Sequence, residues 1–173
     1  LCIWNVDDLR TPDSIEIMAK VLDDNPDIDL VYGNYVIVSK FGETNGQFVD
    51  VEPHIPELKE GMILGPFFMF RKSLIEKSGL FDEQLIQGPD YDLALRLVRN
   101  GKAHFIPDNL GYYLNEGLGM STKPNSKQPI ERTVIELRYN VRVLEPQLVP
   151  HTREYDVENI IVDEEKIPVS NFI

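Results

Sequence analysis

Two closely spaced pairs of carboxylates are the side chains of this sequence best suited to chemistry, and the first pair is Asp7 and Asp8. They follow an apolar run at residues 1–4, which is typical of a buried strand. Adjacent carboxylates repel each other, and Mg²⁺ or Mn²⁺ bound to a diphosphate would relieve this, because hard cations take carboxylate and phosphate oxygens together. The alternative is a strand-to-helix turn in which both side chains accept hydrogen bonds from backbone N–H groups. The residues alone leave both interpretations open.

The second pair, Asp90 and Asp92, brackets Tyr91 after a Gly-Pro step, at the start of a helix predicted over residues 90–100. A carboxylate held at a rigid helix start could act as a general base facing a ligand crevice. In the alternative, Asp90 is the N-cap and Asp92 lies in the first turn, where the helix dipole favours negative charge. Taken alone, this pair favours the capping role.

Composition narrows the classes of protein and site. The 173 residues include 29 Asp and Glu against 17 Lys and Arg, a formal net charge of −12. Such a chain repels phosphate backbones, so a basic nucleic-acid interface is excluded, whereas a phosphate bridged by a cation is not. A single cysteine excludes an internal disulfide and a multi-thiolate metal site, and indicates a reducing compartment. The sequence contains neither a glycine-rich phosphate loop nor a Gly-x-Ser-x-Gly motif, so P-loop and hydrolase functions have no support.

The order of predicted elements is typical of an α/β domain, in which the carboxyl ends of strands line a ligand crevice. Apolar periodicity and glycine stops mark the elements, and Thr11 is the predicted N-cap of the first helix. We expect strands at residues 1–4, 30–38 (with a bulge at Gly33), 66–70, 103–106 and 110–114; helices at 12–24, 72–78, 90–100 and from 129; a hairpin and loop at 40–61; and a loop at 115–121.

Four short blocks stand in order between residues 1 and 121. They are NVDD at 5–8 with TPD at 11–13, NPDIDLVYG at 25–33, FRKS at 70–73 with GLFDE at 79–83, and PDYDLALRL at 89–97. Together they resemble the family 2 glycosyltransferases, enzymes of the GT-A fold. The resemblance implies a GT-A-like mixed sheet with flanking helices. Since the chain opens on an apolar strand-like run, we expect it to be a piece of a longer protein, lacking the N-terminal nucleotide-binding strands and inactive alone.

The resemblance also implies roles for individual residues. Asp7 and Asp8 would contact the ribose of a nucleotide-diphosphate sugar and the metal, Mg²⁺ or Mn²⁺, that bridges its diphosphate. Asp90 would be the general base that deprotonates the acceptor hydroxyl in an inverting, metal-dependent transfer. Phe81 and Asp82 would lie beside the acceptor, with Asp82 either structural or functional.

The sequence departs from the family pattern at several positions. Asn5 stands where many members have Asp, and Pro89 replaces a Glu beside the base. In a segment similar to the family's "yRxH…S", Leu114 replaces Arg and Glu116 replaces a His that can ligate metal. Glu116 could still bind the cation through oxygen, or be a solvent-exposed glutamate in a glycine-bearing loop. These departures support a competing hypothesis, a non-catalytic GT-A-like domain for binding or assembly.

Three segments are expected along the chain. Residues 1–122 would be the C-terminal part of a GT-A catalytic domain, 123–150 a linker and amphipathic helix, and 151–173 an acidic irregular tail. The helix at 129–145 would pack on the domain or on a second copy to form a homodimer; its apolar stripe is Ile130, Val134, Leu137, Val141 and Leu144.

The partners expected from the resemblance are a nucleotide-diphosphate sugar donor and a saccharide or lipid-linked acceptor, without nucleic acid. No apolar run reaches the roughly 20 residues of a membrane-spanning helix. The expected location is cytoplasmic, with peripheral association at the inner face of the membrane as an option, in cell-surface polysaccharide biosynthesis.

Overall fold

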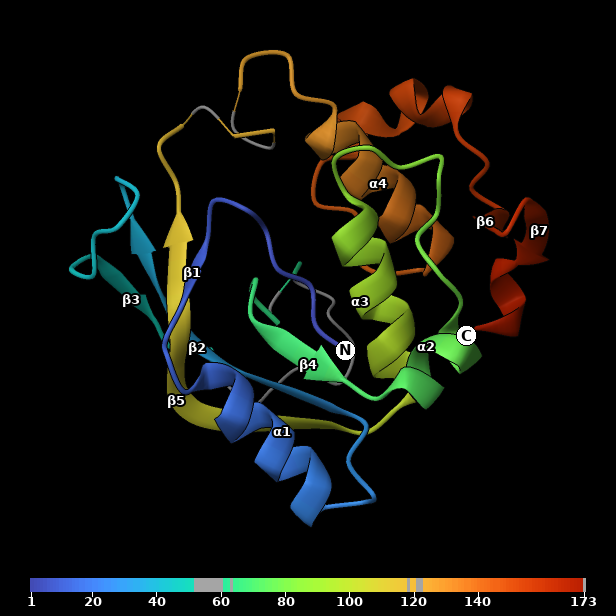
Figure 1. Ribbon diagram of the computed structural model, residues 1–173. Helices are drawn as coiled ribbons and strands as arrows, with labels where there is room; N and C mark the ends of the chain where they lie inside the picture. Colours follow the sequence, from blue (N-terminus) through green and yellow to red (C-terminus); the bar gives the residue numbers. More distant parts are fainter. Residues whose placement is uncertain (52–60, 63, 118, 121–122, 173) are drawn as a thin grey trace.

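A mixed sheet built around one long strand, with helices on its faces, organises the chain (Figure 1). The computed structural model describes residues 1–51, 61–62, 64–117, 119–120 and 123–172. Its mixed sheet and flanking helices confirm the predicted α/β class. The helices are α1 (Ser14–Asp24), α2 (Lys72–Ser78), α3 (Pro89–Asn100), α4 (Gln128–Arg138) and the 3₁₀ helices η1 (Pro146–Glu154) and η2 (Val169–Asn171). The strands are β1 (Leu9–Arg10), β2 (Leu30–Val38), β3 (Gln47–Val49), β4 (Phe68–Phe70), β5 (Ala103–Leu114), β6 (Asn159–Val162) and β7 (Glu165–Pro168).

Strand β2 is the centre of the sheet. It pairs in parallel with β5 and antiparallel with β3 and β4, while β1 pairs antiparallel with β5. Alternation along β2 sends Leu30 and Tyr32 into one apolar cluster and Val31 into the other. One cluster lies against α1, and the other gathers residues of α2, α3 and α4, so the sheet is covered by helices on both faces (Figure 1).

The predicted bulge at Gly33 is confirmed. The register of β2 against β5 shifts between Gly33 and Asn34, opposite Ile106 and Asn109. A Cβ at Gly33 would lie 2.7 Å from the Ile106 carbonyl oxygen, so the close backbone approach requires glycine. Residues 103–106 and 110–114, predicted as two strands, form the single strand β5. That prediction was wrong because the bulge absorbs Pro107, which has no N–H to donate, and the ladder then resumes.

The start of the chain differs from the prediction in two ways. Residues 1–4 form no long buried strand: Cys2 makes an isolated bridge to Met69, and Leu1 and Trp4 are 58% and 57% exposed. Apolar residue types do not distinguish a buried strand from a segment along the rim of a sheet. Helix α1 begins at Ser14 with Asp13 as N-cap, because the Thr11 hydroxyl donates instead to the Asn109 carbonyl of β5.

The last third of the chain is more ordered than predicted. Helix α4 ends at Arg138 and buries Glu131, Glu136 and Arg138 itself, whereas Leu144 of the predicted stripe is exposed. The tail, predicted to be irregular, forms the β6–β7 hairpin, which lies beside α2 (Figure 1). Its apolar residues join the same core as α3 and α4, so this core draws on all three predicted segments.

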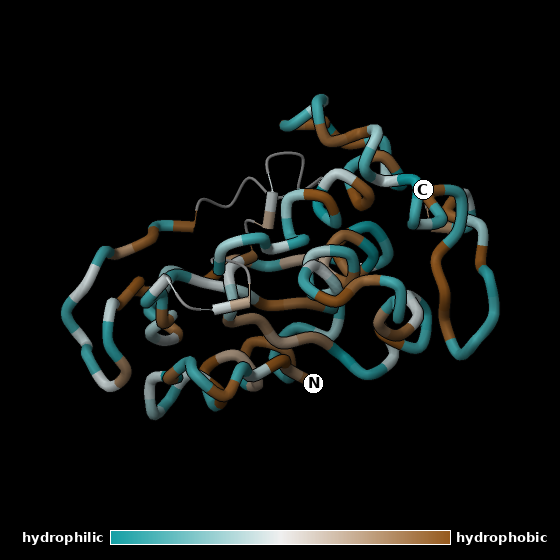
Figure 2. The backbone as a smooth tube through the Cα atoms, turned by 90° about the horizontal axis from the view of Figure 1, so that it is seen from above, coloured by the Kyte–Doolittle hydropathy of each residue, from teal (hydrophilic) through white to brown (hydrophobic). Residues whose placement is uncertain are grey.

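Figure 2 shows polar and apolar residues alternating along the helices. Among the helices of the described residues, none is both long enough and apolar enough to span a bilayer.

Candidate active site

A cavity of about 900 Å³ lies where four parts of the chain meet. Its walls come from residues 3–7 before β1, residues 86–91 around the start of α3, residues 113–116 at the end of β5, and one side of α4. The cavity thus opens next to the carboxyl end of β5, the place that the α/β pattern predicts for a ligand crevice.

Three of the carboxylates singled out from the sequence line this cavity. Asp7, Asp90 and Glu116 are each exposed and come from three separate segments. Among the described lining residues, Arg132 of α4 is the one that carries a positive charge, and its Nε donates to Glu136. The cavity therefore holds more negative than positive side chains, which suits a ligand that brings a cation or a proton to be removed.

Asp8 lies behind the cavity wall and is only 3% exposed. One carboxylate oxygen accepts a hydrogen bond from Asn5 Nδ2 at 2.9 Å and the other from the Leu114 N–H at 3.1 Å. Burial raises its pKa, an effect that these two hydrogen bonds oppose. Asp8 thus joins the turn at residues 5–8 to the end of β5, and this turn presents Asp7 to the cavity.

Asp90 occupies the first turn of α3 rather than its N-cap. Gly88 is the N-cap and Pro89 the first helical residue, a position where the missing N–H of proline costs nothing. The Asp90 carboxylate accepts a hydrogen bond from the Tyr91 N–H at 2.9 Å. Although it faces the cavity, the protein around it withdraws water, and this desolvation raises its pKa. A raised pKa makes a carboxylate a stronger base.

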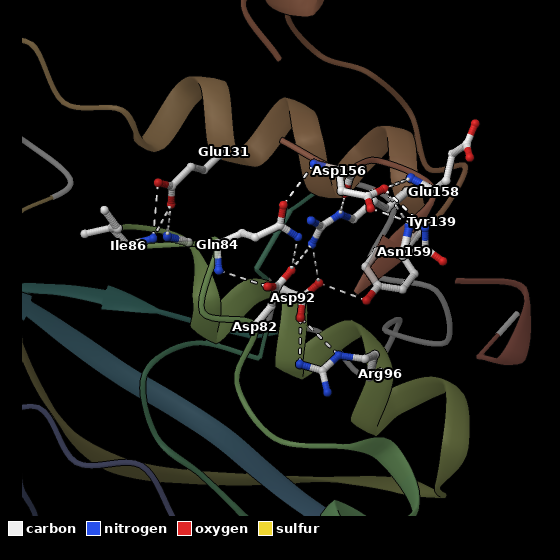
Figure 3. A network of polar contacts seen from close by, with 12 residues as sticks. Asp82, Gln84, Ile86, Asp92, Arg96, Glu131, Tyr139, Asp156, Glu158 and Asn159 are labelled. Atoms are coloured by element: carbon white, nitrogen blue, oxygen red, sulfur yellow. Dashed lines mark hydrogen bonds and ion pairs between the residues drawn. The ribbon is translucent and has the colours of Figure 1, made fainter. Parts of the chain in front are cut away.

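Asp92, the partner of Asp90 in sequence, points into the protein instead. It is fully buried and accepts hydrogen bonds from Arg96 Nε at 3.0 Å, Arg96 Nη2 at 2.6 Å and the Tyr139 hydroxyl at 2.8 Å (Figure 3). Burial raises the pKa of Tyr139, so its phenol keeps the proton that it donates. Asp82 is buried in the same network, paired with Arg138 of α4. Both carboxylates are therefore structural, whereas Phe81, beside Asp82, lines the cavity.

The polar face of α4 is what the sequence analysis missed. Glu131, Glu136 and Arg138 are each no more than 3% exposed. Charged residues at helical spacing usually indicate a solvated face, so the sequence carried no signal that would have revealed them. Glu131 holds the segment that leads into α3, and Arg138 reaches Asp82.

The carboxylates of the cavity could hold a cation only if a bound ligand, such as a diphosphate, supplied further oxygen atoms. Within the described residues, no group of three or more His, Cys, Asp or Glu side chains could hold a metal ion. A Mg²⁺ ion bound to phosphates commonly uses one or two protein carboxylates. Asp7 lies in the cavity, and each Asp8 oxygen keeps a second lone pair beside its hydrogen bond. Ser121 of the "yRxH…S" segment lies outside the described residues.

Comparison with known proteins finds a similarity over part of the chain. No protein-family model matches it. Over 107 residues it is 27% identical to an uncharacterized glycosyltransferase of Methanocaldococcus jannaschii. The match covers 58% of this chain and 36% of that protein, so the chain spans about a third of the length of its relative. The chain is thus similar, over part of its length, to a glycosyltransferase.

Proposed function

We propose that this chain forms part of a metal-dependent, inverting glycosyltransferase of the family 2, GT-A type. The reaction would move a sugar from a nucleotide-diphosphate donor to an acceptor hydroxyl. The main support is that Asp7 and Asp90, from two separate sequence blocks, line the same cavity. The distant relationship to a glycosyltransferase supports the same class of reaction.

Asp90 is the proposed general base. Its carboxylate takes the proton of the acceptor hydroxyl while that oxygen forms a bond to the anomeric carbon of the donor. The bond between this carbon and the diphosphate breaks, and the electron pair leaves with the nucleoside diphosphate. The position of Asp90 in the first turn of α3 fixes the carboxylate on a rigid element, and its raised pKa favours proton uptake.

Asp7 is the proposed contact for the donor ribose and for a cation on its diphosphate. Asp8 and Glu116 are further candidate ligands of Mg²⁺ or Mn²⁺, Asp8 from behind the wall and Glu116 from the end of β5. When bound, such a cation would stabilise the negative charge on the departing diphosphate.

Aromatic side chains on the cavity wall favour a saccharide acceptor or the saccharide end of a lipid-linked one. Trp4 and Phe81 line the cavity and are 57% and 42% exposed, so part of each side chain is accessible to a ligand, while the Arg10 guanidinium lies over the Trp4 ring. Cell-surface polysaccharide biosynthesis, a cytoplasmic location at the membrane face and a homodimer through residues 129–145 stay predictions from the sequence.

The test uses the full-length protein that contains this chain. Asp90→Asn removes the base while keeping the side-chain volume, and should lower transfer from UDP- or GDP-sugars in the presence of Mn²⁺ by about 10²–10⁴-fold. Asp23→Asn, on the exposed side of α1 and away from the cavity, is the matched control and should keep full activity. Binding of UDP or GDP with Mn²⁺, measured by calorimetry, should survive in both variants.

Two outcomes would contradict the proposal. Unchanged turnover in Asp90→Asn would remove Asp90 from the mechanism. Manganese-dependent nucleotide binding without turnover in the wild type, across a panel of donors and acceptors, would favour the non-catalytic GT-A-like domain instead.

A further inference from the structure

A buried glutamate on α4 holds the segment that leads into α3. Glu131 is 0% exposed, and its carboxylate accepts hydrogen bonds from three consecutive backbone N–H groups, of which Figure 3 labels that of Ile86. The distances to Glu131 Oε2 are 3.0 Å from Ile86, 2.6 Å from Gln87 and 2.9 Å from Gly88. The Tyr155 hydroxyl donates to the other oxygen at 3.2 Å.

This contact satisfies the polar groups on both of its sides. The N–H groups of residues 86–88 precede the first intrahelical hydrogen bond of α3, which runs from the Asp92 N–H to the Gly88 carbonyl, so no carbonyl of that helix accepts them. A buried carboxylate without donors would likewise cost several kcal/mol. Glu131 therefore holds, from another helix, the turn that leads into α3, and its negative charge lies near the N-terminal end of α3, where the helix dipole favours it.

The segment that Glu131 holds is also part of the cavity. Residues 86–88 line it and lead directly into Pro89 and Asp90. Close packing leaves little freedom here, because a Cβ at Gly88 would lie 3.2 Å from Ile135 Cδ1. The three hydrogen bonds to Glu131 thus help to fix the position and orientation of the first turn of α3 relative to α4.

We propose that Glu131 is a positioning residue for Asp90, fixing from α4 the start of α3 and with it the carboxylate that faces the acceptor. The inference rests on the proposed function, in which Asp90 is the general base. It makes α4, which follows the four sequence blocks that resemble the family, part of the catalytic apparatus. Asp7 and the donor side of the cavity do not depend on these bonds, so the effect is confined to the step that uses Asp90.

The test substitutes Glu131→Gln in the full-length protein. An amide keeps the volume but removes the negative charge that strengthens the three hydrogen bonds to Oε2, and it places an NH₂ group, which cannot accept, where Oε1 faces the Ile86 N–H and the Tyr155 hydroxyl. We expect kcat to fall by about 10–100-fold, since small misplacements of a reacting group cost this much, while the Kd for UDP or GDP with Mn²⁺ stays within twofold. Amide hydrogen exchange of residues 86–88 should become faster.

Ile160→Val provides the matched control. Ile160 is fully buried in β6, away from residues 86–88, so its truncation lowers stability without touching the hydrogen bonds to Glu131. It should leave both kcat and the exchange of these amides unchanged. If Glu131→Gln proves too unstable to purify, Glu131→Asp keeps the charge but shortens the reach, and should show the same loss of kcat and of amide protection.

The readouts separate the possible failures. Wild-type kcat in a folded Glu131→Gln protein, with Asp90→Asn inactive, would overturn the positioning role. The same holds if kcat and nucleotide affinity fall together. If Asp90→Asn is active, the proposed function fails, and the exchange of residues 86–88 still reports whether Glu131 holds the start of α3.

Discussion

The ion pair between Asp92 and Arg96 offers a direct test of how α3 is held in the fold. Both side chains are 0% exposed, and Arg96 Nη2 lies 2.6 Å from Asp92 Oδ2. Arg96 Nη1 also donates to the carbonyls of Ser78 and Gly79 at the end of α2. Arg96→Met keeps an unbranched, largely apolar side chain, although a shorter one, and removes all of these donors. Asp92 then loses its closest cation and keeps the Tyr139 hydroxyl as hydrogen-bond donor and the more distant Arg138 Nη1, at 3.7 Å, as its remaining ion-pair partner.

The expected loss follows from the burial of the pair. Removing one partner of a buried ion pair costs about 3–5 kcal/mol, because the remaining charge is left in a low-dielectric interior. At 2–4 °C for each kcal/mol in a chain of this size, the melting temperature should fall by about 6–20 °C. Thermal unfolding followed by far-UV circular dichroism, and urea unfolding for the free energy, measure the effect.

An exposed pair with the same spacing serves as control. Lys20 and Asp24 of α1 are also four residues apart and 2.8 Å from each other, but their side chains are 72% and 59% exposed. Lys20→Met should change the free energy of unfolding far less than Arg96→Met does, since solvent screens the pair. If Arg96→Met destabilises the protein no more than Lys20→Met does, the buried network is not what fastens α3 to α2.

Four further predictions concern the cavity and the sheet. Because desolvation raises the pKa of Asp90 above its ordinary 3.8, activity should fall as the pH drops through that raised value, giving an acidic limb in kcat that moves if the wall around Asp90 is opened. Because the pKa of Asp90 is higher in the folded protein than in the unfolded chain, ionisation of this carboxyl above pH 3.8 lowers the free energy of unfolding. Asp90→Asn should therefore be at least as stable as the wild type at pH 7, and the difference should vanish at lower pH. A less stable variant at pH 7 would contradict this. Asp7→Asn should weaken manganese-dependent binding of UDP or GDP in calorimetry while changing the free energy of unfolding by less than about 0.5 kcal/mol, because Asp7 is exposed; equal nucleotide affinity would exclude it from the donor site. Gly33→Ala should destabilise the sheet by about 1–3 kcal/mol in urea unfolding, since the new Cβ would lie 2.7 Å from the Ile106 carbonyl; no loss would mean that the bulge relaxes freely.

The site was partly predictable because its residues lie at ends of elements with clear local signals. Asp7 and Asp90 were found by residue type and spacing, and both line the cavity. Their proposed roles came from the resemblance and stay predictions. Glu131 was not predictable, because a glutamate on a helix with other charged residues has the pattern of a solvated face. Only its contact with residues 86–88 gives it a role.

The sequence by itself determined the elements whose boundaries depend on nearby residues. Helix α2 runs from Lys72 to Ser78 as predicted, because Gly79 at φ 81° takes a backbone conformation that other residues adopt at a cost. The end of α3 before Gly101 and the bulge at Gly33 were also predicted from glycines. At Gly33, however, the glycine is required by the Ile106 carbonyl of β5, so the sequence predicted the position and the fold supplies the reason.

Only the tertiary structure decided which carboxylate of each pair faces the cavity. Asp90 and Asp92 are two positions apart on a helix with 3.6 residues per turn, so they differ by about 200° and point to opposite sides. The helical spacing therefore predicts that Asp90 and Asp92 cannot both face the cavity. The buried Arg138 and Tyr139, which α4 brings against α3 from more than 40 residues away, select Asp92 for the interior and leave Asp90 at the cavity.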